Sequence, residues 1–178
     1  ASLALDMSRH EADFPITYAW GGSIKNHLAG LDCPGFIHGL MFYLGFPEAE
    51  KRFNTQALYL KLRRNRSWET IFDTAIHQEV FDPSLLRPGD VIVWPSGLDD
   101  GRNLPGPIWG HVGVVTQGDS GALWVAHYVQ SDAYNSLDVV GPPGPGLNTL
   151  PAADFVRLKE RGLLGVFRQR QIGGISTG

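Results

Sequence analysis

The spacing of apolar residues changes partway along this chain, and that change constrains the fold more than any other feature. After Cys33 the apolar residues recur every three or four positions, as on one face of a buried helix: Phe36, Ile37, Leu40, Met41 and Leu44. Later segments are short apolar runs bounded by Gly, Pro and Asp, which are typical of strands: 91–94, 111–115, 123–127 and 163–167. Helices followed by strands predict an α+β fold in which helices pack on an antiparallel sheet.

Three helices are predicted in the first half of the chain. The first begins at Cys33 and ends at Gly45, which suits a C-terminal cap. A second is predicted over residues 47–64. A third is predicted after Ser67, a suitable N-cap, over the apolar residues of 68–76.

Turn-forming residues divide the second half of the chain. Residues 86–90 predict a turn into the strand 91–94, and residues 117–121 predict the turn of a hairpin. Two Gly- and Pro-rich stretches, 95–107 and 141–151, are predicted to be loops. The first is long enough to serve as a lid over a cleft.

Length and charge limit the function classes. The 178 residues suit a single domain, with 1–14 as a loose lead-in, and 43% apolar residues suffice for a core. The net charge of −3 gives no reason to expect a nucleic acid as partner. No apolar run approaches the roughly 18–20 residues needed to span a bilayer. No signal peptide is visible, which carries little weight because the chain begins with Ala rather than Met.

Cys33 is the only cysteine, so an internal disulfide is excluded. A lone cysteine is either a small buried hydrophobe or a reactive group. The position of Cys33 favours the second interpretation. Unpaired N–H groups and the helix dipole stabilise negative charge at a helix N-terminus, and this favours the thiolate. Cys33 is therefore the candidate nucleophile.

Two histidines are candidates for the base that a thiol nucleophile needs. His111 opens a strand directly after Gly110, at the rim of the expected cleft. If the hairpin turn is centred on Asp119, residues whose numbers sum to 238 face one another, and His111 and His127 form such a pair. His127 would then orient the ring of His111. A slip of one residue would put the rings on opposite faces, and the alternative for His127 is a half-buried histidine bonded to backbone.

A metal site is the competing interpretation of these three residues, since one Cys and two His can bind zinc. The histidines lie 16 positions apart, and the short His-x₃-His and Cys-x₂-Cys spacings are missing. We therefore expect neither a metal nor another cofactor.

Four short blocks, taken together, resemble the NlpC/P60 family of cysteine peptidases. They are Tyr-Ala-Trp-Gly-Gly at 18–22, Gly-Leu-Asp-Cys-Pro-Gly-Phe at 30–36, Leu-Arg-Pro-Gly-Asp at 86–90 and Gly-His-Val-Gly-Val at 110–114. Each block is weak alone, but all four follow the family's order. The resemblance covers the segment from roughly residue 15 to 130.

The resemblance implies a papain-like α+β core, with the nucleophile helix packed on a small antiparallel sheet. It implies Cys33 as nucleophile, His111 as base and His127 as the residue that orients the base. Tyr18 matches a family tyrosine whose hydroxyl helps to stabilise the oxyanion. The alternative for Tyr18 is an aromatic wedge under the helix.

The expected substrate-binding residues are Asp32, Trp20 and Gly110. Asp32 matches a residue that holds a substrate's free amine in family members, although a helix cap is the alternative. Packing is the alternative for Trp20. One residue departs from the family pattern, because Pro34 stands where the family usually has Ser. The missing hydroxyl changes the expected recognition of an N-terminal amine.

The resemblance implies a cysteine peptidase or amidase that cuts an amide bond of a peptidoglycan stem peptide, in the periplasm or cell wall. A thiol acyltransferase, or an amidase acting on another amide, is the first alternative. A non-catalytic wall-binding module with a decayed site is the second. An antibacterial effector or phage lysin is favoured over a fragment of a larger hydrolase, and an inhibitor or immunity protein is a further possible partner.

Overall fold

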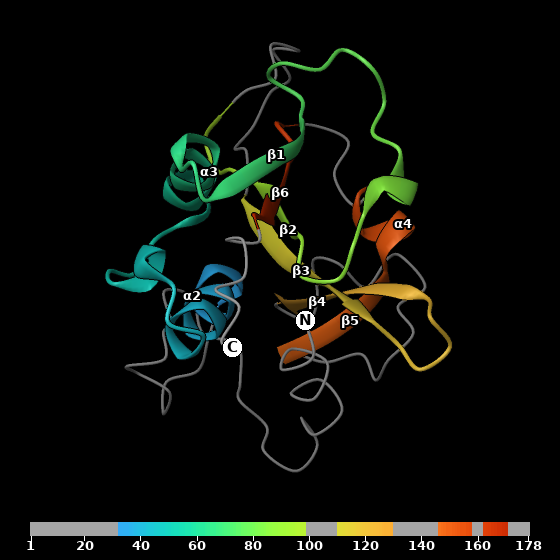
Figure 1. The fold of residues 1–178 in the computed structure, drawn as a ribbon, viewed down its shortest axis with the longest axis horizontal. Helices are drawn as coiled ribbons and strands as arrows, with labels where there is room; N and C mark the ends of the chain where they lie inside the picture. Colours follow the sequence, from blue (N-terminus) through green and yellow to red (C-terminus); the bar gives the residue numbers. More distant parts are fainter. Residues whose placement is uncertain (1–31, 99–109, 130–145, 158–161, 171–178) are drawn as a thin grey trace, which may run out of the picture.

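A six-stranded antiparallel sheet organises the computed structural model, which describes residues 32–98, 110–129, 146–157 and 162–170. The strands lie in the order β1-β6-β2-β3-β4-β5 (Figure 1). Their bounds are β1 Trp68–Asp73, β2 Val91–Trp94, β3 His111–Gln117, β4 Leu123–Val129, β5 Gly146–Pro151 and β6 Gly165–Gln169. The helices are α2 Cys33–Tyr43, α3 Thr55–Arg64 and α4 Ala152–Phe155, with single 3₁₀ turns η2 Pro47–Ala49 and η3 Pro83–Leu85. The predicted α+β class is confirmed.

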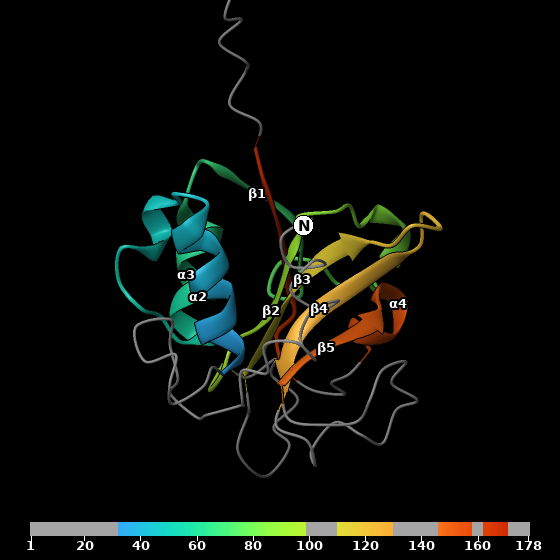
Figure 2. The same ribbon diagram turned by 90° about the horizontal axis from the view of Figure 1, so that it is seen from below.

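The sheet lies between unequal layers. Helices α2 and α3 cover one face, and the short α4 covers the other (Figure 2). Alternation along the strands separates the two cores: Val112, Val114 and Ala126 pack with α2, whereas Val115 and Val125 pack with Phe155 of α4. No helix in the described part of the chain is long and apolar enough to cross a membrane.

Helix α2 has the ends that its sequence predicts. The Asp32 side chain caps its start by accepting a 2.7 Å hydrogen bond from the Gly35 N–H. Gly45 follows the last turn with φ +73°, and the Phe46 N–H donates to the Met41 carbonyl at 2.9 Å. This pattern is a Schellman cap, which favours glycine because a left-handed backbone strains other residues.

The predicted third helix, over 68–76, is wrong, because residues 68–73 form strand β1. Trp68 and Phe72 are buried and Glu69 is exposed, while the pairing with β6 contains an irregularity between Thr70 and Phe72. That irregularity interrupts the alternation of the strand, so Trp68 packs in the core on the side of α2 and α3, whereas Phe72 packs in the core on the other side. The apolar spacing of this short segment is compatible with a helix and with a strand. Pairing with the distant strand β6 decides in favour of the strand.

Two other boundaries differ from the predictions. The helix expected over 47–64 is broken, because the single turn η2 is followed by a fresh start at α3, where the Asn54 side chain accepts from the Ala57 N–H at 2.8 Å. The loop expected over 141–151 contains strand β5, which pairs with β4, and α4 follows it directly. Backbone pairing with β4 stabilises residues whose own composition favours a loop.

The turn at 86–90 fastens three strands together. Gly89 has φ +94° and donates its N–H to the Val115 carbonyl at 2.8 Å. The buried Asp90 carboxylate accepts two 2.8 Å hydrogen bonds from the Arg168 guanidinium of β6. Paired bonds of this kind are strong and directional, so the turn fixes β2 and β6 beside each other.

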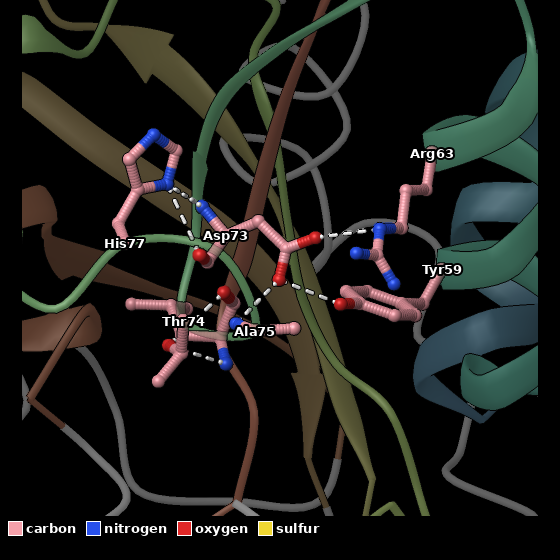
Figure 3. A network of polar contacts seen from close by, with 7 residues as sticks. Tyr59, Arg63, Asp73, Thr74, Ala75 and His77 are labelled. Carbon is pink, nitrogen blue, oxygen red and sulfur yellow. Dashed lines mark hydrogen bonds and ion pairs between the residues drawn. The ribbon is translucent and has the colours of Figure 1, made fainter.

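A second buried carboxylate, Asp73 at the end of β1, joins the sheet to α3 (Figure 3). It accepts a 2.6 Å hydrogen bond from the Tyr59 hydroxyl and a 2.9 Å bond from the Ala75 N–H, and it forms a 2.9 Å ion pair with Arg63. Burial, together with the bond to Asp73, raises the pKa of Tyr59 above its usual range. Tyr59 is therefore a permanent donor to this carboxylate.

We predict that Tyr59→Phe lowers the free energy of unfolding by about 1–3 kcal/mol, because a buried carboxylate loses one of its donors. Urea denaturation followed by circular dichroism measures the change. Tyr43→Phe is the matched control, since Tyr43 is 72% exposed and should tolerate loss of its hydroxyl. Equal stability of the two variants would contradict the structural role of Tyr59.

Candidate active site

Cys33 is the first residue of α2, as the sequence predicts, and only 7% of its surface is exposed. Pro34 follows in the first turn, where a missing N–H costs no helical hydrogen bond. The helix start leaves backbone N–H groups directed at the region of the sulfur. This placement suits a thiolate and an oxyanion that would form beside it.

Asp32 performs the cap that was the alternative to substrate binding. One carboxylate oxygen accepts from Gly35, and the other forms a 2.8 Å ion pair with Arg52. The guanidinium offsets a negative charge directly beside Cys33. Arg52 was missed by the sequence analysis, because it lies 20 residues away in a connecting segment and no local spacing links the two. A contact between Asp32 and a substrate amine stays a prediction.

His111 and His127 are in direct contact. The His111 Nε2 and the His127 Nδ1 lie 2.9 Å apart, within hydrogen-bond distance, and the rings are 2% and 1% exposed. The predicted register is wrong by two residues, since Gly113 lies opposite His127. A shift of two keeps the same face, so the two rings are diagonal rather than direct neighbours. We call these two residues the His pair.

Aromatic rings surround the His pair on the face away from α2. The Phe155 ring of α4 lies 5.6 Å from the His111 ring and 4.9 Å from the His127 ring, measured between centroids. The Trp94 ring, from β2, stacks on His111 at 6.5 Å and makes a tilted contact with Phe155 at 5.1 Å. The sequence gives no signal that points to Phe155, because this residue follows the segment 141–151, whose composition favours a loop.

The surroundings of His127 decide its charge. Burial lowers its pKa to about 3, so the ring is neutral in the physiological range. Its Nδ1 faces His111, and its Nε2 has no hydrogen-bond partner among the described residues. A neutral imidazole can accept through one nitrogen while the other carries the proton. His127 can therefore accept a hydrogen bond from the Nε2–H of His111 without becoming charged itself.

Cys33 and the His pair lie toward the same end of the sheet. Phe36, in the first turn of α2, packs at 5.5 Å on Tyr128, the residue after His127. Tyr128 points to the face that α2 covers, whereas the His pair points to the face that α4 covers. A reaction that uses both groups must therefore occur at the strand end where His111 opens β3.

Gly110 has a packing reason to be glycine. A Cβ added there would lie 1.9 Å from the Thr55 hydroxyl oxygen and 2.9 Å from the Ser96 backbone nitrogen. Neither contact is sterically possible, so Gly110 lets the start of α3 approach the residue before His111. A contact between Gly110 and substrate stays a prediction. Tyr18 and Trp20, also predicted site residues, lie outside the described residues.

Within the ranges that the structure describes, no group of three or more His, Cys, Asp and Glu side chains is arranged to hold a metal ion. The described chemistry of this end of the sheet is that of one thiol and two imidazoles.

We predict that His127 makes the protein less stable in mild acid. In the unfolded chain its imidazole binds a proton near pH 6.5, whereas in the folded chain the buried imidazole stays unprotonated. Stability is therefore full above that pH and falls below it, by about 2 kcal/mol between pH 7 and pH 5. His127→Asn, which keeps a polar atom near the position of Nδ1, should lack this contribution. Urea denaturation at several pH values measures the difference between the two slopes.

Phe81→Leu serves as control for this measurement. Phe81 is buried in the same core as Phe155 and does not touch the His pair, so its loss should lower stability equally at both pH values. A wild-type slope in the His127→Asn variant would contradict a neutral, buried His127.

Comparisons with known proteins add no family. No protein-family model matches the chain, and no curated protein matches it significantly. The resemblance to NlpC/P60 peptidases accordingly remains a resemblance of four short blocks.

Proposed function

We propose that this protein is a cysteine peptidase or amidase that hydrolyses an amide bond in peptidoglycan stem peptides. The observation that carries the proposal is the buried hydrogen bond between His111 and His127, at the end of the sheet where α2 begins with Cys33. A base held by a second polar residue and a thiol at a helix start are the two components that thiol hydrolysis needs. The four sequence blocks supply the substrate class.

The reaction begins with the transfer of the Cys33 thiol proton to His111. The thiolate attacks the amide carbonyl, and a C–S bond forms as the carbonyl oxygen becomes an oxyanion. N–H groups at the start of α2 stabilise this charge, with the Tyr18 hydroxyl as the second donor that the resemblance implies. His111 then gives its proton to the departing amine nitrogen, and the C–N bond breaks.

Water completes the cycle. His111 accepts a proton from a water molecule, whose oxygen attacks the thioester carbonyl, and the thiolate leaves as the acid product is released. His127 stays neutral throughout and accepts a hydrogen bond from the Nε2–H of His111. This bond leaves Nδ1 as the nitrogen of His111 that exchanges protons with sulfur, amine and water.

The proposed setting is the bacterial cell wall or periplasm, reached as an antibacterial effector or a lysin. An acyltransferase would use the same thioester and differ only in the final acceptor, which would be an amine or alcohol. Product analysis distinguishes the two, because hydrolysis yields a free carboxylate and transfer yields a new amide or ester.

We predict that Cys33→Ala abolishes the release of peptides from purified sacculi and leaves the thermal unfolding midpoint close to that of wild type. The nucleophile is lost, but a small apolar side chain still fills its place. Mass spectrometry of the released fragments measures turnover and identifies the cut bond. Undiminished digestion by the Cys33→Ala variant would refute the proposal.

Contact between thiol and imidazole is tested separately through alkylation. We predict that iodoacetamide labels Cys33 in the wild type faster than it labels free cysteine, and that His111→Asn slows the labelling at least about tenfold at pH 6. His77→Asn, which removes an imidazole at the end of β1, is the control and should label at the wild-type rate. Equal rates in all three proteins would show that His111 does not reach the sulfur.

A further inference from the structure

We propose that Phe155 is a positioning residue for the reaction, because its ring excludes water from the His pair and holds the pair in one tautomeric arrangement. The inference rests on the proposed function for its catalytic consequence. The observation behind it is geometric: both histidines are buried, and one side chain, Phe155, contacts both rings.

Phe155 is completely buried and contacts both members of the pair. Its ring lies 4.9 Å from that of His127 with an interplanar angle of 67°, and 5.6 Å from that of His111 at 37°. A residue that touches both rings restrains the orientation of each relative to the other. The same ring lies against Trp94, so the pair has an aromatic wall on two sides.

Gly113 creates the space that the Phe155 ring occupies. It lies directly opposite His127 in the hairpin, where a side chain would point to the same face as the His pair. A Cβ added to Gly113 would lie 2.8 Å from the Phe155 Cζ and 2.4 Å from the Val125 Cγ1. Neither neighbour is the end of a long flexible side chain, so glycine here and phenylalanine at 155 are matched.

Charged groups are absent from the described surroundings of His127. From β3 it meets His111, and from β5 the neutral Asn148 lies opposite it. The charged residues beside Phe155, Asp154 and Arg157, are exposed, and burial is the one cause that lowers the pKa of His127. The neutrality of His127 therefore depends on exclusion of water, and α4 supplies the cover on this face.

Exclusion of water determines which nitrogen acts as base. While His127 stays neutral, it can accept from the His111 Nε2, and the pair carries a single exchangeable charge at His111 Nδ1. If water reached His127 Nε2, the ring could take a proton at moderately acid pH. It would then repel a charged His111, and part of the protein would lose the active protonation state.

The test compares Phe155→Ala with Phe81→Ala, which removes the same ring from the same core without touching the His pair. Nitrogen-15 NMR of the imidazoles, recorded from pH 4 to pH 8, reports the protonation of His127 directly and requires no turnover. In the wild type and in Phe81→Ala, His127 should stay neutral down to pH 4, because burial lowers its pKa to about 3. Phe155→Ala should raise the midpoint of the His127 titration by about one pH unit or more, so that protonation of His127 becomes visible within this range.

A gentler variant keeps the test decisive if Phe155→Ala does not fold. Phe155→Leu keeps most of the apolar volume and should produce a smaller rise in the same direction. An unchanged His127 titration in a folded Phe155 variant would overturn the inference. So would an equal rise in Phe81→Ala, because the effect would then follow from lost stability.

Activity adds the catalytic arm of the experiment. The acid limb of the kcat/KM profile on sacculus-derived peptides should move upward in Phe155→Ala, because protonation of His127 removes active protein, and it should stay in place in Phe81→Ala. A wild-type protein that shows no hydrolysis would overturn the proposed function and leave the NMR result standing. Hydrolysis with an unmoved acid limb, beside a moved titration, would overturn the catalytic role of Phe155.

Discussion

The pairing of β3 with β4 is the constraint on which the candidate site depends. It places Gly113 opposite His127 and so brings the His111 ring, two residues earlier, to a diagonal position on the same face. A register changed by one residue would move one ring to the other face and abolish the 2.9 Å contact. Glycine at 113 then leaves room for Phe155, so one hairpin positions both the pair and its cover.

Buried carboxylates paired with cations hold this hairpin in the rest of the fold. Asp90 receives two hydrogen bonds from Arg168, and Asp73 receives an ion pair from Arg63 and a hydrogen bond from Tyr59. The first links residues that are 78 positions apart, and the second links the consecutive elements α3 and β1. Each would leave an uncompensated buried charge if one partner were removed. Such pairs favour the contacts of β2 with β6 and of β1 with α3, because each carboxylate keeps its partners only when these elements meet.

The two halves of the proposed chemistry come from opposite faces of the sheet. Cys33 belongs to the helix layer on one face, while the His pair is packed against α4 on the other. The contact of Phe36 with Tyr128 brings the start of α2 to the strand end where the histidines lie. The proposed reaction therefore requires thiol and imidazole to meet at this end of β3 and β4.

The sequence by itself determined the features that depend on neighbours along the chain. These are the start of α2 at Cys33 with its Asp32 and Gly45 caps, the alternating strands and the shared face of His111 and His127. Tertiary structure alone decided that 68–73 is a strand, that Arg52 neutralises Asp32 and that Phe155 covers the His pair. Caps and alternation arise from local backbone geometry, whereas a strand without a clear period and a contact across loops gain their stability only from distant partners.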